Sequence, residues 1–122
     1  MRLYPIVFVA CCAALASTPA PAGAEARYVF CDNGLRCIKA PCPSNNALDL
    51  ATGTVMRGVS LDPDRLPDGT AERVRGGKLV VRGFIQRRTV TYAGKEYVLP
   101  FLVATAAERA STPAENARCF SR

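Results

Sequence analysis

The residues most able to do chemistry in this chain are its cysteines, because it contains 6 Cys and no His. Histidine is the commonest general base and the commonest metal ligand among side chains. Its absence excludes Ser-His-Asp and Cys-His catalysis, zinc sites that include histidine, and haem bound through a histidine. We therefore expect a protein that is not an enzyme and carries no cofactor. Two cysteines precede the predicted mature domain, and the other four are Cys31, Cys37, Cys42 and Cys119.

The four later cysteines have the pattern of disulfides rather than of a metal site. Five residues separate Cys31 from Cys37 and four separate Cys37 from Cys42, whereas zinc knuckles and thioredoxin-like redox sites use a spacing of two. An even number of cysteines in a short exported chain is typical of a disulfide framework. Of the three possible pairings we favour Cys37 with Cys42, because Ala40-Pro41 can turn a tight loop. We also favour a bond from Cys31 to Cys119, which lies near the C-terminus and would tie the two ends of the domain together.

The first 24 residues are predicted to be a cleaved signal peptide. Residues 3–16 are almost wholly apolar and contain no carboxylate, and they are too few to span a bilayer comfortably. The small residues Ala22-Gly23-Ala24 fit a signal peptidase site, with Ala26 as an alternative point of cleavage. Cleavage after Ala24 leaves one small β domain, residues 25–122, with 15 Lys and Arg against 10 Asp and Glu and thus a net charge of +5. This predicts a periplasmic or secreted protein with no transmembrane span in the mature chain.

An alternative for the N-terminus makes Cys11 a lipid-bearing residue, because Val9-Ala10-Cys11 loosely resembles a bacterial lipoprotein box. Only ten residues precede Cys11, which is few for such a signal. The apolar run also continues through Leu15, beyond the point where lipidation would cut the chain. Under this alternative the protein is anchored to a membrane rather than free.

Short runs of β-branched and aromatic residues, divided by turn residues, predict a mainly β domain. Two pairs of runs predict hairpins, one around the turn at 51–53 and one around the turn at 93–95. Gly83 is expected to mark a bulge or bend that exchanges faces, and Pro100 to lie on an edge or at a bulge. The predicted strands are residues 27–30, 47–50, 54–61, 78–92 and 96–104.

The remaining segments predict loops and turns with little helix. The cysteine loop covers residues 31–43. Residues 62–69 are expected to form a surface turn or one short helical turn, capped by Asp62 or Asp64. Residues 105–109 are expected to form one helical turn, after which the tail packs or pairs beside the first strand. The predicted fold is a small antiparallel sheet or partly open barrel of five or six strands, stapled by disulfides, with little helix beyond the signal peptide.

The most distinctive motif of the chain is Cys37-Ile38-Lys39-Ala40-Pro41-Cys42-Pro43. Three further motifs follow it, namely Leu48-Asp49-Leu50-Ala51-Thr52-Gly53, Leu79-Val80-Val81-Arg82-Gly83 and Leu102-Val103-Ala104-Thr105-Ala106-Ala107. In this order the motifs resemble secreted bacterial domains of unknown function that are built around an Ala-Pro-Cys-Pro cysteine loop and a C-terminal β-hairpin. The resemblance covers residues 27–109. It implies an exported Gram-negative protein, lipid-anchored or free in the periplasm, and supplies no activity or catalytic residues to carry over.

The cysteine loop also resembles the binding loop of small serine protease inhibitors of the Bowman–Birk type. Such inhibitors present a basic residue two positions after a cysteine, and Lys39 stands two positions after Cys37. A rigid exposed loop binds a protease cleft with little further ordering of the chain. The ring here is shorter, Pro41 stands only two residues beyond Lys39, and the usual polar residues are missing. The simpler alternative is a stapled turn that holds the first loop of the sheet.

Basic residues are concentrated between positions 73 and 88. If Arg82 and Arg88 share a strand face with Phe84 and Tyr92, the face mixes cations with aromatic rings, as polyanion-binding surfaces do. For an exported protein this favours an anionic glycan or lipid over nucleic acid. The alternative is a solvated strand face whose arginines limit aggregation. The basic residues are Arg73, Arg75, Lys78, Arg82, Arg87 and Arg88.

Acidic residues suggest no firm metal or catalytic site. Asp62, Asp64 and Asp68 invite a calcium interpretation, but their loop contains two prolines and lacks the order of an EF-hand loop. A capped turn is favoured. Pairs such as Asp49 with Glu96 or Ser60 with Lys78 could serve an enzyme, but nothing in the sequence indicates that they meet. We expect a non-catalytic binding or structural protein of the envelope, whose partner is an envelope protein or an anionic glycan or lipid.

Overall fold

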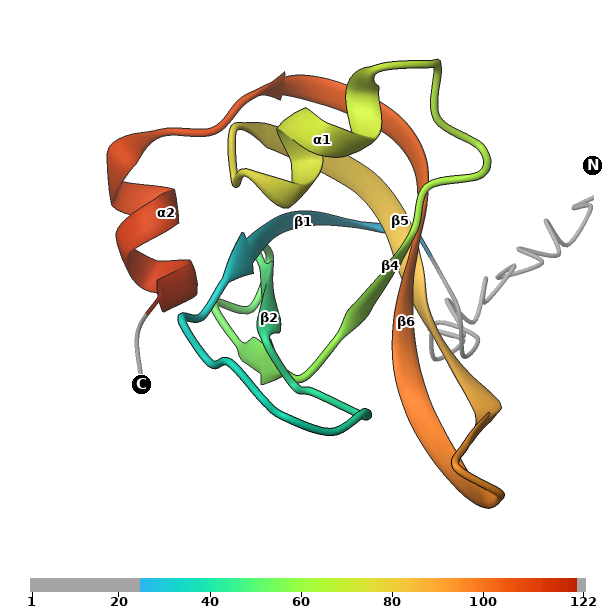
Figure 1. Cartoon of the computed structure of the whole chain (residues 1–122). Coiled ribbons are helices and arrows are strands. Elements are labelled where there is room, and N and C mark those ends of the chain that lie inside the picture. The colour runs from blue at the N-terminus through green and yellow to red at the C-terminus, as the bar shows by residue number, and fades with distance from the viewer. Residues whose placement is uncertain (1–24, 121–122) are drawn as a thin grey trace, which may run out of the picture.

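The computed structural model describes residues 25–120, so the predicted signal peptide and Cys11 lie outside the described residues. Residues 25–120 form a six-stranded sheet in the order β3-β2-β1-β5-β6-β4, with two short helices (Figure 1). The prediction of a mainly β fold with five or six strands and little helix is confirmed. The elements are β1 (Ala26–Asp32), β2 (Asn45–Asp49), β3 (Val55–Arg57), β4 (Ser60–Asp62), α1 (Thr70–Arg75), β5 (Leu79–Tyr92), β6 (Lys95–Ala110) and α2 (Pro113–Phe120).

β5 and β6 form a long antiparallel hairpin whose turn is set by two residues. Ala93 and Gly94 have φ values of 51° and 76°, as the central residues of a type I′ turn require. The predicted turn is confirmed. The predicted return strand is too short, because β6 continues to Ala110, and the helical turn expected at 105–109 is wrong. The start of β5 pairs with residues 109 and 110 of β6, and this pairing outweighs the weak helix preference of the segment.

Two residues of β6, Thr105 and Glu108, are extra in its pairing with β5. The register between the strands shifts twice, once beside Val81 and once beside Gly83. The predicted irregularity at Gly83 is confirmed, but the inserted residues lie in β6, so the alternation of faces changes there rather than in β5. A Cβ on Gly83 would collide with the carbonyl oxygen of Val103, which explains the glycine. Because bulges redirect side chains, Thr105 and Glu108 are placed to reach neighbouring strands.

The predicted strand at 54–61 is divided into two strands at opposite edges of the sheet. Gly58 has a φ of 72° and ends β3, and a Cβ there would lie 2.8 Å from Pro43. β4 then pairs in parallel with residues 101–103 of β6. The sheet is therefore mixed rather than antiparallel throughout, and it curls without closing, because β3 and β4 do not pair. Pro100 lies just outside the segment of β6 that pairs with β4, as expected for a strand edge.

Two apolar clusters lie on opposite faces of the sheet, because successive side chains of β1 and β5 point to opposite sides. We call them the large cluster and the disulfide cluster. α1 contributes Val74 to the large cluster, and α2 contributes Cys119 to the disulfide cluster. The large cluster comprises Tyr28, Phe30, Ala47, Val59, Leu66, Val74, Leu79, Val81, Leu102 and Ala104. The disulfide cluster comprises Val29, Cys31, Leu48, Val80 and Cys119, with Leu50 and Val55 packed against it.

The cysteines pair as predicted. Cys31 is bonded to Cys119 with a Cα–Cα distance of 6.2 Å, and Cys37 is bonded to Cys42 with a Cα–Cα distance of 5.5 Å. The Cys31–Cys119 bond is buried and joins β1 to α2. The tail packs beside β1 as expected, but it does so as a helix that the sequence interpretation did not anticipate.

The start of α2 is a reciprocal capping box. The Thr112 N–H donates to Glu115 Oε1 at 2.9 Å, and the Glu115 N–H donates to Thr112 Oγ1 at 3.2 Å. Pro113 stands at the first helical position, where its missing N–H costs nothing. These contacts fix where the helix begins and therefore where Cys119 lies against β1.

The turn at 62–69 is present, and Asp62 caps it as predicted, because its Oδ1 accepts a hydrogen bond from the Asp64 N–H at 3.1 Å. The helix α1 that follows is separate from this turn. It is preceded by Gly69, which has a φ of 81° and provides no side-chain cap. Within residues 25–120, neither helix has the length and apolar character that a membrane crossing requires.

Candidate functional site

The loop between β1 and β2 carries the predicted site residue Lys39. Cys37 and Cys42 close a ring of six residues, and the Ala40–Pro41 peptide bond within it is cis. Lys39 is exposed, and the exposed fraction of Ile38 is 103%, the value of a side chain with no neighbours. The tip of the loop therefore presents an apolar and a basic side chain to solvent, inside a covalent ring.

The base of this loop is held by hydrogen bonds. The Asn33 N–H donates to the Ser44 carbonyl at 2.8 Å, and Asn33 Nδ2 donates to the Pro43 carbonyl at 2.7 Å and to Asn46 Oδ1 at 3.0 Å. Arg36 binds Asp32 through two nitrogens, and this contact lowers the pKa of Asp32 below its ordinary value. The loop thus has an anchored base and a free tip.

The basic residues of the 73–88 segment do not share one binding partner or one element. Arg73 and Arg75 lie on α1, whereas Arg82, Arg87 and Arg88 lie on β5. Arg82 forms an ion pair with Glu108. The predicted basic residues are therefore distributed over α1 and β5, but Arg82 and Arg88 share a face of β5 with Phe84, because the extra residues of the two bulges lie in β6.

Arg88 is committed to contacts within the protein. It donates to Asp62 at 2.5 Å and to Gln86 at 2.7 Å, and its guanidinium lies 4.8 Å from the centre of the Phe101 ring. The hydrogen bond from Arg88 is the main cause of the lowered pKa of Asp62. Asp62 is thus occupied by an arginine and a turn amide, and no cluster of potential metal ligands occurs within residues 25–120.

The carboxylate pair considered for catalysis is divided between two distant parts of the topology. Asp49 ends β2, where it accepts hydrogen bonds from the amides of Ala51 and Thr52 in the following turn. Glu96 lies beside the turn of the β5–β6 hairpin, where it pairs with Thr91. Each residue is explained by its local strand or turn.

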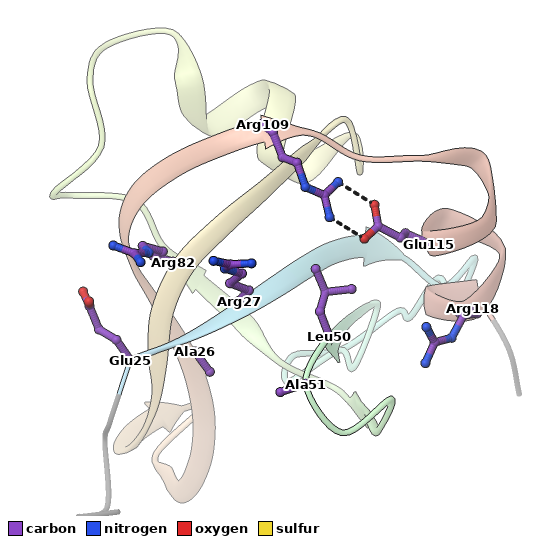
Figure 2. A pocket seen from close by; sticks show the side chains of 9 residues that line it. All are labelled: Glu25, Ala26, Arg27, Leu50, Ala51, Arg82, Arg109, Glu115 and Arg118. Carbon is purple, nitrogen blue, oxygen red and sulfur yellow. Dashed lines mark hydrogen bonds and ion pairs between the residues drawn. The ribbon is translucent and has the colours of Figure 1, made fainter.

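A cleft of about 640 Å³ lies on the side of the sheet that carries the disulfide cluster, next to α2 (Figure 2). Along β1, this face changes from the buried Cys31 and Val29 to the exposed Arg27, and along β5 from the buried Val80 to the exposed Arg82. The apolar core therefore ends where an arginine-lined surface begins. The lining residues are Glu25, Ala26, Arg27, Leu50, Ala51, Arg82, Arg109, Glu115 and Arg118.

The two bulges of β6 supply the polar contacts of one wall of this cleft. Glu108, the extra residue of one bulge, forms ion pairs with Arg27 at 3.0 Å and with Arg82 at 2.7 Å. Thr105, the extra residue of the other, donates its hydroxyl hydrogen to Glu25 at 2.5 Å. The irregular pairing of β5 with β6 is thus what gathers these charged groups on one surface.

The second wall of the cleft is built from β6 and α2. Arg109 binds Glu115 through two parallel contacts of 2.8 Å each, drawn as dashed lines in Figure 2. The hydrogen bond from Arg109 lowers the pKa of Glu115 from 4.5 to about 2. Both groups therefore stay charged at neutral pH.

Only Arg82 of this cleft was among the residues singled out from the sequence. Arg27, Glu108, Arg109 and Arg118 were missed because they are scattered along the chain and meet only through strand register, bulges and the position of α2. The capping sequence Thr112-Pro113-Ala114-Glu115 was the one local signal that could have revealed α2 and with it the second wall.

Comparisons with protein-family models, with curated proteins and with solved structures find no match to this chain. The resemblance to secreted bacterial domains with an Ala-Pro-Cys-Pro loop therefore stays a prediction.

Proposed function

We propose that this chain is an exported, non-catalytic binding domain that presents its Cys37–Cys42 loop to a protein partner. The observation that carries the proposal is the exposure of Ile38 and Lys39 at the tip of a covalently closed ring. An apolar side chain with no neighbours gains free energy only when a partner covers it. A ring that is already closed loses little conformational entropy on binding.

In its sharpest form, the proposal makes the partner a serine protease with an acidic specificity pocket. Lys39 would enter that pocket, as basic residues enter the aspartate-bearing pocket of trypsin-like enzymes. Ile38 would contact the wall of the cleft beside it. The hydrogen bonds of Asn33 and the Asp32–Arg36 pair support this by holding the base of the loop.

Export is proposed on the N-terminal sequence and on the two disulfides, which are typical of oxidising compartments. Cleavage after Ala24 fits the strand pairing better than cleavage after Ala26. Ala26 belongs to β1 and pairs with Gly83 of β5, so cleavage after Ala26 would remove a paired residue. Release into the periplasm or the medium is favoured over a lipid anchor at Cys11. The intact mass of the exported protein, measured before and after reduction, tests these statements together, and a mass that retains Met1 would refute export processing.

The protease proposal is tested by titrating a trypsin-like protease with the exported, disulfide-intact protein. We expect stoichiometric inhibition by the unchanged protein. In Lys39→Ala the affinity for the protease should fall about 100-fold or more, as for a central binding residue. Lys95→Ala is the matched control, because Lys95 is also exposed but lies at the turn of the β5–β6 hairpin. Equal effects of the two substitutions, or no inhibition of any protease in a panel, would contradict the proposal.

A further inference from the structure

We propose that the arginine-lined cleft is a second binding site, independent of the loop, for a phosphate or sulfate ester group. The group would be carried by a larger molecule, such as a glycan or a lipid headgroup. The cleft volume of about 640 Å³ falls in the range of small-molecule sites. It is much larger than a free inorganic anion needs.

Two of the arginines keep donor groups that the protein does not use. Arg27 and Arg82 each approach Glu108 most closely through Nε. The Glu108 carboxylate therefore contacts two guanidinium groups, each along its Nε edge. Among residues 25–120, no hydrogen bond joins an Nη atom of Arg27 or Arg82 to another residue, and both ion pairs with Glu108 have their closest contact at Nε. Arginine nitrogens in this state are suited to a ligand that brings its own acceptor oxygens.

Arg118 supplies a third guanidinium from the other side of the cleft. It lies in the last turn of α2, and it forms no ion pair with any carboxylate of residues 25–120. Its Nη2 atom occupies space beside Gly53, where a Cβ would lie 2.5 Å away. In Figure 2, Leu50 lies between Arg118 and Arg27. Arg118 is thus a cation beside the β2–β3 turn that no carboxylate among the described residues neutralises.

Arg109 has a different part in the cleft. Its guanidinium is bound to Glu115 through two nitrogens and also donates to its neighbour's carbonyl at Ala110. This pair fastens α2 to the end of β6 and so fixes the position of Arg118. We therefore count Arg27, Arg82 and Arg118 as the groups available to a ligand.

The arrangement favours a tetrahedral oxyanion over a carboxylate. The three available guanidinium groups come from β1, β5 and α2, so an anion whose acceptor oxygens do not all lie in one plane is better placed to contact them than a planar anion. A phosphate or sulfate ester offers three such oxygens, whereas a carboxylate offers two, and arginine is well matched to phosphate.

The rest of the cleft fits the body of such a ligand. Four arginines face the three carboxylates of Glu25, Glu108 and Glu115, which leaves an excess of one positive charge. Leu50 and Ala51 give the floor an apolar patch that suits a sugar ring or a glycerol backbone. Glu25 is held by Thr105 at the end of the cleft that carries Arg82, whereas no carboxylate among the described residues binds Arg118 at the other end.

The site is tested by following amide NMR signals of the disulfide-intact protein during titration with inorganic phosphate, sulfate and acetate at constant ionic strength. We expect saturable shifts near Arg27, Leu50, Arg82 and Arg118 with phosphate and sulfate, and at least tenfold weaker binding of acetate. Equal affinity for acetate would show a non-selective cationic surface and overturn the proposal. An adventitious ion only, seen as linear shifts that never saturate, would also overturn it.

The key variant is Arg118→Gln, which breaks no ion pair with the described residues and is therefore expected to fold. Phosphate affinity should fall about tenfold in this variant, as for the loss of one charged hydrogen bond. Arg75→Gln is the matched control, since Arg75 is also exposed at the end of a helix but lies on α1, outside the cleft. If both variants lose affinity equally, the effect is one of net charge and the site does not exist.

The source of the ester group is decided by two further probes. Binding to phosphatidylcholine vesicles that contain phosphatidic acid, but not to phosphatidylcholine alone, would assign a lipid headgroup. Binding to a sulfated disaccharide would assign a glycan. Either must be weakened by Arg118→Gln. Failure of both probes, with phosphate still bound, would overturn the inference of a larger ligand. All these readouts are separate from protease inhibition, so failure of the loop proposal leaves the cleft proposal unaffected.

Discussion

The two disulfide bonds lie in contrasting regions of the molecule, one between Cys31 and Cys119 and the other between Cys37 and Cys42. The first joins residues 88 positions apart and is buried between β1 and α2, whereas the second joins residues five positions apart in an exposed loop. Asn46 lies between the two regions, because its side chain donates to the Cys119 carbonyl at 3.0 Å and accepts from Asn33 at the base of the loop. The contrast indicates that one bridge maintains the fold and the other maintains the shape of a surface segment.

The largest effect is expected from removing the long-range bridge. In Cys31→Ala/Cys119→Ala the unfolded chain regains the entropy of a loop of about 89 residues, which corresponds to a loss of about 4 to 5 kcal/mol in the free energy of unfolding. Chemical denaturation of the exported protein measures this loss. A loss no greater than that of the short-ring variant below would break the distinction between the two bridges.

The next largest effect is expected at the residue that connects the regions. Asn46 is 2% exposed, and Asn46→Ala leaves the buried Cys119 carbonyl without this donor, at a cost of about 2 to 3 kcal/mol. Asn45→Ala is the control on the same strand, because Asn45 is only partly buried and its side chain bonds to the neighbouring Ser44 hydroxyl. Similar losses of unfolding free energy in the two variants would show that the hydrogen bonds of Asn46 stabilise the fold no more than those of Asn45.

Opening the short ring is expected to cost less and to act locally. In Cys37→Ser/Cys42→Ser the lost loop constraint corresponds to about 2 kcal/mol at most. Amide NMR shifts should change in residues 33–46 and remain unchanged in β5 and β6. Changes that spread through the large cluster would mean that the ring also supports the core.

The smallest effect is expected at the cap of α2, the helix that carries Cys119. Glu115→Gln removes the ion pair with Arg109 and weakens the capping box, with an expected loss of about 1 kcal/mol at neutral pH. Folding lowers the pKa of Glu115 from 4.5 to about 2. Its ionised form therefore stabilises the fold fully above the unfolded pKa, and this contribution is lost as the pH falls from about 4.5 toward 2. Unfolding measured across this range should show a shallower decline in Glu115→Gln than in the unchanged protein, and parallel declines would contradict the assignment.

Local residue types were sufficient to predict much of the sheet. The β-branched and aromatic run of β5, with Gly94 after it, predicted the long hairpin, and Gly53 marked the turn between β2 and β3 with its φ of 74°. The disulfide pairing followed from the loop around Pro41 and from the closeness of Cys119 to the chain end. These features depend on short segments or on covalent chemistry, so sequence alone carries them.

Features that depend on distant pairing were mispredicted. Residues 105–109 are strand rather than helix because β5 needs a partner along its whole first half. Residues 54–61 divide at Gly58 because β6 offers β4 an edge on the far side of the sheet. Neither edge could be recognised before the register of the long hairpin was known.

The arginine-lined cleft could not be derived from the sequence for a related reason. Its available cations are Arg27, Arg82 and Arg118, which no local pattern connects. β1 must pair with β5 to bring Arg27 opposite Arg82, and a bulge must turn Glu108 toward both. The capping box at Thr112 could have predicted the start of α2, but the position of Arg118 depends on where α2 packs, which the sequence does not show.

The two ends of the long β5–β6 hairpin are expected to open at very different rates. β1 pairs with β5 only as far as Gly83, and β4 pairs with β6 only at residues 101–103, so the outer part of the hairpin is a two-stranded ribbon projecting from the sheet (Figure 1). Isolated two-stranded ribbons are marginally stable in water. Amide hydrogens near Val90 and Val98 should therefore exchange with solvent far faster than those of Val80 and Val81. All four residues belong to the same hairpin, and Val80, Val81 and Val90 lie on the same strand. Amide hydrogens of one hairpin are thus expected to exchange through local opening at its tip and only through global unfolding at its base.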